Sequence, residues 1–129
     1  MSTTTATQPK WMTIVGWVLT VAPCALLAMS ATMKFRQPPE MAAQLEKLGY
    51  PANVWTPLGI VESTCTLLFL LPPTRVLGAI LLTGYLGGAT ATHVRVSEPW
   101  FTPVVVGVVL WLALVLRDPR LRALVPIAR

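Results

Sequence analysis

The sequence predicts an all-α integral membrane protein, a bundle of four transmembrane helices with a short interfacial helix in the first outer loop. Two observations indicate this fold. The 129-residue chain is 54% hydrophobic and only 12% charged, which is too apolar for a typical soluble domain. It also contains four apolar segments close to the roughly 20 residues that cross a hydrocarbon core of about 30 Å. The predicted spans are residues 11–33, 54–71, 76–93 and 101–117, within one membrane domain of residues 10–117.

The first apolar segment lies between Lys10 and Lys34 and contains no charged residue. A cleaved signal peptide is the alternative interpretation, with Ala28-Met29-Ser30 as its cleavage site. However, the segment exceeds the roughly 7–15 apolar residues of a signal core, and three more apolar segments follow it. We therefore interpret it as a span with a kink near Pro23. Residues 1–9, rich in Ser and Thr, are expected to form a disordered cytoplasmic lead.

The first loop is the longest connection and contains a short helical pattern. Met41, Leu45 and Leu48 recur at helical spacing, and Pro39 suits the first turn of a helix. Gly49-Tyr50-Pro51 then ends the pattern. These features predict a short helix lying in the outer interface. Two roles stay open for it: a gate over a site in the bundle, or a simple connector.

The other connections are short. Pro72-Pro73-Thr74-Arg75 leaves room only for a tight turn, so the second and third spans are expected to form an antiparallel hairpin. Trp100 and Phe101 in the third loop match Tyr50 and Trp55 near the start of the second span. This pattern is typical of an aromatic belt at the outer interface. The fourth span has no ionisable residue before Arg117, which ends it, and is interpreted as scaffold.

The distribution of Lys and Arg predicts the orientation. The side that holds both termini and the second loop carries six of these residues, and the opposite side carries four: Lys10, Arg75, Arg117, Arg120, Arg122 and Arg129 against Lys34, Arg36, Lys47 and Arg95. Both termini are therefore expected on the cytoplasmic side of the membrane. The basic tail of residues 118–129 can contact anionic lipid headgroups, so the net charge of +5 requires no nucleic-acid partner.

Glu62 is the residue that most strongly suggests a functional site. It is the only formally charged side chain between Lys47 and Arg75. A carboxylate at bilayer depth costs roughly 2.5–3.5 kcal/mol on insertion scales, so such residues are rare and face the interior of a bundle. In a low dielectric the group either takes up a proton or finds a cation.

Lys34 and His93 end the first and third spans, which places them in the same outer half of the bundle as Glu62. Three titratable groups on three helices predict a polar cavity open to the outer face. We take Glu62, Lys34 and His93 as candidate catalytic residues. The residues expected to line the cavity are Ser30, Thr66, Tyr85 and Thr90, with Trp55 as a further aromatic wall. The alternative is that Glu62 and Lys34 form a buried ion pair that only fixes helix register; His93 favours a site, because a simple pair needs no third group.

Other motifs carry less information. One His with one Glu is too small a ligand set for structural zinc or haem, so no metal site is expected. Cys24 and Cys65 lie at similar depth on adjacent spans, but Cys24 is about 80° around its helix from Lys34, and membrane cysteines usually fill apolar space. Gly84 and Gly88 have a small-xxx-small spacing that permits close helix packing, within the chain or between copies.

Several short motifs, in order and spacing, resemble the DoxX-like family of small four-helix bacterial membrane proteins. The resemblance covers roughly residues 11–116, with Ala31 and Phe35 replacing the usual Gly and Leu of the first motif. The motifs are Ser30-Ala31-Thr32-Met33-Lys34-Phe35, Leu48-Gly49-Tyr50-Pro51, Gly59-Ile60-Val61-Glu62, Arg75-Val76-Leu77-Gly78 and Gly87-Gly88-Ala89-Thr90-Ala91-Thr92-His93.

The resemblance implies two functions of different classes. DoxX relatives are linked to membrane oxidoreductase complexes, to sulfur-compound oxidation coupled to quinone and to thiol stress. On that basis Glu62, Lys34 and His93 would bind a quinone or small lipophilic substrate and transfer its protons beside a partner redox enzyme. Similar vertebrate proteins are assembly chaperones, which implies a non-catalytic membrane assembly subunit as the alternative. A small-solute carrier is a third and weaker hypothesis.

Overall fold

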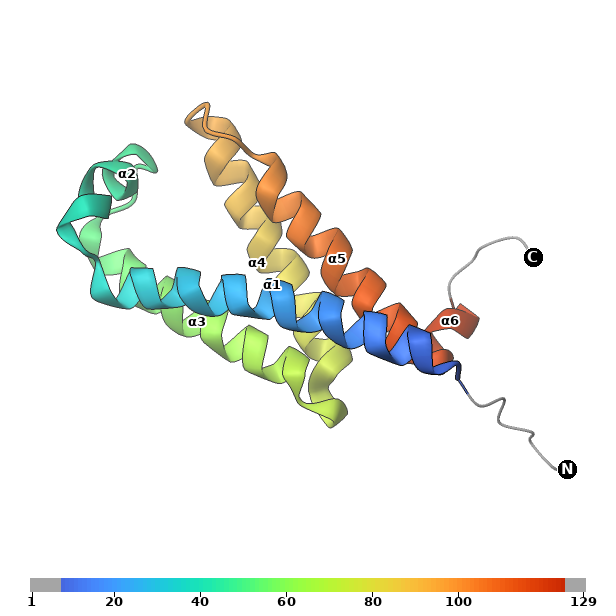
Figure 1. Ribbon diagram of the computed structural model, residues 1–129. Coiled ribbons are helices and arrows are strands. Elements are labelled where there is room, and N and C mark those ends of the chain that lie inside the picture. Colours follow the sequence, from blue (N-terminus) through green and yellow to red (C-terminus); the bar gives the residue numbers. More distant parts are fainter. Residues whose placement is uncertain (1–7, 125–129) are drawn as a thin grey trace, which may run out of the picture.

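The computed structural model describes residues 8–124, and this part of the chain is all-α, as predicted (Figure 1). Four long helices carry the fold, with two short helices and two 3-10 turns between and after them. These are α1 Lys10–Arg36, η1 Pro39–Met41, α2 Ala42–Lys47, α3 Ala52–Leu70, η2 Pro72–Thr74, α4 Arg75–Arg95, α5 Phe101–Arg117 and α6 Pro119–Leu124. The predicted disordered lead, apart from its last two residues, and residues 125–129 of the basic tail lie outside the described residues.

Each long helix contains one of the predicted apolar segments, but their lengths differ. α1 has 27 residues and is long and apolar enough to cross a membrane by itself. α3 and α4 meet the same criterion only as a pair joined through a bend, and α5 is apolar but has 17 residues. By length and composition, one or at most two membrane-crossing units therefore occur among the described residues.

The long helices contact one another in a ring. α1 packs on α3 and α5, and α4 packs on the same two helices. Figure 1 shows that the α1–α3 pair and the α4–α5 pair converge near the α3–α4 turn and spread apart toward α2. The apolar core lies in the convergent part, where Leu27, Phe69, Leu82 and Leu110 are almost fully buried. The fold is therefore closed at one end and splayed at the other.

The turn between α3 and α4 differs from the predicted antiparallel hairpin. The chain changes direction by 107°, well short of a reversal. The helices meet closely beside the turn, where Gly78 lies against the backbone of Leu68 and Phe69 with no room for a Cβ atom. Thr74 further fixes the turn by donating its hydroxyl to the Leu68 carbonyl at 2.8 Å. This wide angle separates α4 from α3 with distance from the turn and opens the other end of the fold.

The close contact at Gly78 gives a test of this geometry. Gly78→Ala should lower the Tm of the detergent-purified protein, because the new methyl group would overlap backbone atoms that cannot move aside. Overpacking of this kind costs about 1–3 kcal/mol. Gly84→Ala on the same helix is the matched control, since an added Cβ there meets no atom within 4 Å. Equal Tm values for the two variants would contradict the close approach of α4 to α3.

Candidate functional site

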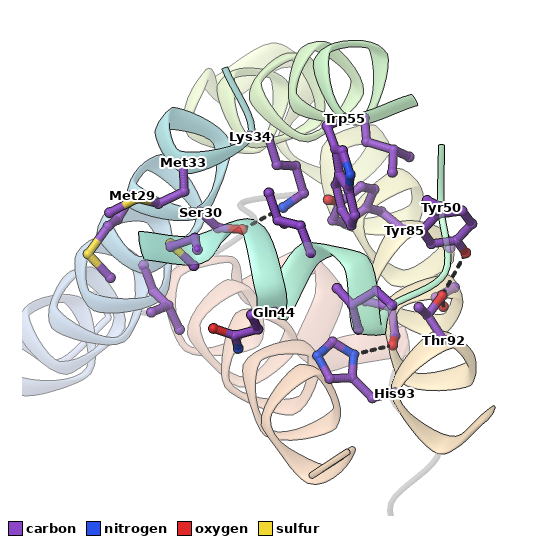
Figure 2. A pocket seen from close by; sticks show the side chains of 18 residues that line it. Met29, Ser30, Met33, Lys34, Gln44, Tyr50, Trp55, Tyr85, Thr92 and His93 are labelled. Carbon is purple, nitrogen blue, oxygen red and sulfur yellow. Dashed lines mark hydrogen bonds between the residues drawn. The ribbon is translucent and has the colours of Figure 1, made fainter. Parts of the chain in front are cut away.

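A cavity of about 550 Å³ occupies the splayed end of the fold (Figure 2). Its walls come from the C-terminal half of α1, the first loop with α2, the start of α3 and the second half of α4. The lining residues are Leu26, Met29, Ser30, Met33, Lys34, Met41, Gln44, Leu45, Leu48, Tyr50, Trp55, Leu58, Gly84, Tyr85, Gly88, Ala89, Thr92 and His93. The lining is mostly apolar with a few polar groups, which is the usual composition of a site for a small molecule.

The apolar face predicted for the first loop faces this cavity. Met41, Leu45 and Leu48 all line it, and α2 crosses in front of the cavity in Figure 2. The backbone of α2 contacts that of none of the four long helices. The short helix therefore covers the cavity through side chains alone, as a lid would.

Polar contacts hold the end of the first loop, at Leu48 and Tyr50, to the end of α4. Arg95 donates from Nη2 to the Leu48 carbonyl at 3.0 Å, and its guanidinium lies 5.7 Å from the centre of the Tyr50 ring. The Tyr50 hydroxyl and the Thr92 hydroxyl are hydrogen-bonded at 2.7 Å, as Figure 2 shows. These contacts link the first loop to α4 across the cavity mouth.

Glu62 lies directly behind the cavity wall and is 1% exposed. Its Oε2 accepts three hydrogen bonds: from Lys34 Nζ at 2.8 Å, from the Tyr85 hydroxyl at 3.2 Å and from Ser30 Oγ at 3.3 Å. Lys34 Nζ also donates to Ser30 Oγ at 2.7 Å. The cation predicted to meet this carboxylate is therefore Lys34. We call these four residues the Glu62 network.

The Glu62 network joins three helices and faces the cavity on one side. Ser30 and Lys34 come from α1, Glu62 from α3 and Tyr85 from α4. All members except Glu62 line the cavity. A buried carboxylate needs both an opposite charge and further donors to offset the loss of its hydration, and this arrangement supplies both. The ion pair leaves the cavity wall polar but without a net charge.

His93 lines the cavity from the end of α4, apart from the Glu62 network. Its Nδ1 lies 2.6 Å from the carbonyl oxygen of Ala89, one turn earlier. Because a carbonyl only accepts, Nδ1 must donate this bond, which leaves Nε2 as an acceptor in the neutral ring. No hydrogen bond joins His93 to Glu62 within the described part of the chain. The structure thus brings Lys34 and Glu62 into contact and places His93 on another part of the same wall.

The other predicted lining residues divide into two groups. Trp55 and Tyr85 line the cavity, and Trp55 is itself buried. Thr66 and Thr90 do not line it, and each hydroxyl donates to the carbonyl four residues earlier in its own helix, Glu62 at 2.7 Å and Leu86 at 2.8 Å. A helical threonine can satisfy itself locally in this way, so its polarity is a weak guide to a site.

Gly84 and Gly88 lie on the cavity wall, where an added Cβ would meet no atom within 4 Å. No helix of residues 8–124 packs closely against them, so the missing side chains leave this part of the cavity wall open. Cys24 and Cys65 are both free and buried in the apolar core. No group of three His, Cys, Asp or Glu side chains close enough to hold a metal ion occurs among residues 8–124.

Several lining residues could not be predicted from the sequence. Met29, Met33 and Leu58 are apolar residues of apolar helices, and the chain alone does not tell a cavity wall from a lipid-facing or packed position. Gln44 is polar but lies in a loop helix where polar residues are expected. The spread of the helix pairs, which a sequence pattern does not encode, decides which of these side chains reach the cavity.

Comparison with known families gives one match. The family model described as the DoxX-like family matches residues 18–116, a range that contains every lining residue of the cavity and all of the Glu62 network. No curated protein and no solved structure matches the chain.

The ion pair between Lys34 and Glu62 can be tested by a double-mutant cycle. Glu62→Gln should destabilise the detergent-solubilised protein, because it strands the Lys34 ammonium against an apolar wall. Removing one partner of a buried pair costs about 3–5 kcal/mol, whereas replacing both can be nearly neutral. Glu62→Gln combined with Lys34→Met should therefore recover much of the loss. Additive losses in the unfolding free energies of the two single variants and the double variant would show that the groups do not interact.

Proposed function

The chain belongs to the DoxX-like family, and from this membership we propose an integral membrane protein in which α1, α3, α4 and α5 each cross the bilayer. Large apolar side chains on all four helices support the proposal. Ile14, Ile60, Ile80 and Val108 are each more than half exposed, at 63, 54, 54 and 62%. A protein in water rarely leaves so much apolar surface uncovered, whereas lipid tails can cover it. α3, α4 and α5, with 19, 21 and 17 residues, lie near the length that a span requires.

We further propose that both termini lie in the cytoplasm of a bacterial cell and that the cavity opens toward the outer face of the inner membrane. The start of α1, the α3–α4 turn and the end of α5 lie at the convergent end of the fold in Figure 1. This end carries the larger share of Lys and Arg, which favours the cytoplasmic side.

Reporter fusions test this topology. A fusion at residue 129 and one within the second loop beside Arg75 should report a cytoplasmic position, while fusions beside Lys47 and Ser97 should be exported. The physical reason is the retention of Lys and Arg on the cytoplasmic side during insertion. An exported C-terminal fusion would overturn the orientation, and identical results at all four sites would overturn the four spans.

The cavity supports binding of a small, uncharged lipophilic molecule that carries oxygen acceptors. Its volume of about 550 Å³ lies within the usual range for small-molecule sites. The only charged side chain on its wall, Lys34, is already neutralised by Glu62 at 2.8 Å, so a second charge on the ligand would find no partner. Lys34 Nζ has a third N–H donor beyond those that bind Glu62 and Ser30, and His93 Nε2 offers an acceptor.

A quinone has these properties, and we propose that the protein is a quinone-binding component of a membrane redox system. The observation that carries this proposal is the convergence of Lys34, Ser30 and Tyr85 on one buried carboxylate at the wall of an apolar cavity. Reduction of a quinone takes two electrons and two protons. The electrons would come from a partner redox enzyme. Lys34 would donate its third N–H to a quinone carbonyl oxygen, and Glu62 and His93 would pass protons.

A pair of glycine variants on α4 tests ligand binding. Gly88→Leu places a side chain inside the cavity, whereas Gly87→Leu makes the same change at a position that does not line it; neither new Cβ would meet an atom within 4 Å. Gently purified wild type and Gly87→Leu should retain the same lipophilic molecule, and Gly88→Leu should lose most of it. The measurement is mass spectrometry of an organic extract per mole of folded protein.

Three outcomes of this experiment are informative. A quinone that is lost only from Gly88→Leu supports the redox component. Another lipophilic molecule lost in the same way supports the cavity as a binding site but contradicts the quinone. Equal retention by both variants, or no bound molecule in any sample, contradicts ligand binding in the cavity.

A non-catalytic assembly subunit is the second candidate, and one observation favours it. Gly84, Gly87 and Gly88 form a stripe of α4 on which no described part of the chain packs. Such a stripe allows close approach of a helix from a partner or from a second copy. In that case Gly87→Leu should abolish copurification of the partner while leaving the Glu62 network intact.

A further inference from the structure

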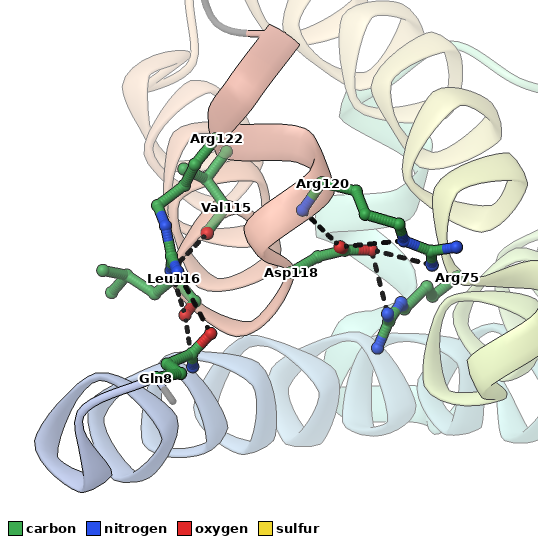
Figure 3. Close-up of polar contacts among 7 residues, drawn as sticks. All are labelled: Gln8, Arg75, Val115, Leu116, Asp118, Arg120 and Arg122. Carbon is green, nitrogen blue, oxygen red and sulfur yellow. Dashed lines mark hydrogen bonds and ion pairs between the residues drawn. The ribbon is translucent and has the colours of Figure 1, made fainter. Parts of the chain in front are cut away.

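A second polar cluster lies at the convergent end of the fold, opposite the splayed end that holds the cavity. Asp118 follows the last residue of α5 and is 2% exposed. Figure 3 shows Arg75 and Arg120 converging on its carboxylate. Arg75 Nη2 donates to Oδ2 at 2.9 Å, and Arg120 donates its backbone N–H to Oδ1 at 3.0 Å. Arg120 adds side-chain bonds of 3.3 Å to each oxygen.

The carboxylate of Asp118 has no capacity left for another cation. A carboxylate offers about four lone-pair positions, and the four bonds from Arg75 and Arg120 occupy them. Burial raises the pKa of this carboxyl, but hydrogen bonds from Arg120 and the charge of Arg75 lower it by more, so the pKa lies below its ordinary value. At neutral pH Asp118 is therefore an ionised carboxylate whose acceptor positions are all in use.

Arg117, the residue before Asp118, has no such partner. Its Nε and Nη2 atoms, and Nε of Arg75, are buried without a hydrogen-bond partner among residues 8–124. The other acidic residues of the chain, Glu40, Glu46, Glu62 and Glu98, lie in the first loop, in α3 and in the α4–α5 loop rather than at this end. Asp118 is thus the one carboxylate at this end of residues 8–124, and Arg75 and Arg120 already bind it.

Stacking explains only part of the position of Arg117. Its guanidinium lies 4.2 Å from the centre of the Trp17 ring, a favourable cation–π distance. Stacking uses the flat face of the guanidinium, however, while its N–H groups point outward in the plane and need acceptors. Arginine does not lose its proton, so a buried, unpaired guanidinium edge is costly unless an anion meets it. The charges of Arg75 and Arg117 also repel each other.

We infer that the edge formed by Arg117 and Arg75 binds a phosphate group, with the phosphodiester of an anionic lipid headgroup as its source. Guanidinium forks match phosphate oxygens in a bidentate geometry. Arg75 begins α4 and Arg117 ends α5, so both lie where the proposed spans leave the hydrocarbon and phospholipid phosphates are found. The inference rests on the proposed membrane arrangement but not on the ligand of the cavity.

Lipid binding by the purified, delipidated full-length protein tests the inference, with native mass spectrometry as the readout. The probes are phosphatidylglycerol and inorganic phosphate. Wild type should retain one phosphatidylglycerol. Arg117→Met and Arg117→Lys should bind it roughly tenfold more weakly, because both lose the guanidinium fork while Lys keeps the charge. Lys10→Gln, which removes an exposed charge at the same end, should bind like wild type.

Each outcome of this test decides a specific point. Loss in both Arg117 variants, with no competition by millimolar inorganic phosphate, supports a lipid phosphodiester. Competition by inorganic phosphate supports the same phosphate chemistry with free phosphate as its source. Binding by Arg117→Lys or Arg117→Met as tight as that of wild type, or no binding of either probe, overturns the site. Circular dichroism confirms that the variants are folded, and Arg117→Lys carries the test if Arg117→Met is not.

Discussion

The fold and its cavity depend on the burial of one carboxylate, Glu62, in an otherwise apolar structure. A carboxylate in this position needs a cation and further donors, and it obtains them from Lys34, Ser30 and Tyr85 on two other helices. Along α3 the network separates two regions. Trp55 and Leu58 before it line the cavity, while Cys65 and Phe69 after it lie in the packed core. The network therefore lies where close packing ends and the cavity begins.

The two ends of the fold differ in the balance between acidic and basic side chains. At the cavity end, Lys34 on the wall is matched by Glu62 behind it, which leaves an uncharged and largely apolar space. At the convergent end, Asp118 is outnumbered by arginines, and the N–H groups left over lie buried beside Trp17. An uncharged ligand suits the first arrangement, and an anion suits the second. The same chain thus presents two sites whose ligands differ in charge.

Much of this could be read from particular residues in the sequence. A lone charged residue in an apolar run must find a partner, and the nearest cation at a helix end was Lys34. The period of Met41, Leu45 and Leu48 located the face of α2 that covers the cavity. The 107° bend between α3 and α4 could not be predicted from the sequence, because Pro72-Pro73 limits the length of the connection but not the angle between the helices. Asp118 and Arg75 meet across 43 positions of sequence, and no local pattern joins them.

The most direct test of this account is the distance between Lys34 and Glu62 in the protein reconstituted in lipid. Solid-state NMR can measure the dipolar coupling between ¹⁵N at Lys34 Nζ and ¹³C at the Glu62 carboxyl carbon. The structure places Nζ 2.8 Å from Oε2, so the account predicts a strong coupling that Glu62→Gln weakens. Absence of this coupling in the wild-type protein would contradict the ion pair, and with it the network on which the cavity wall depends.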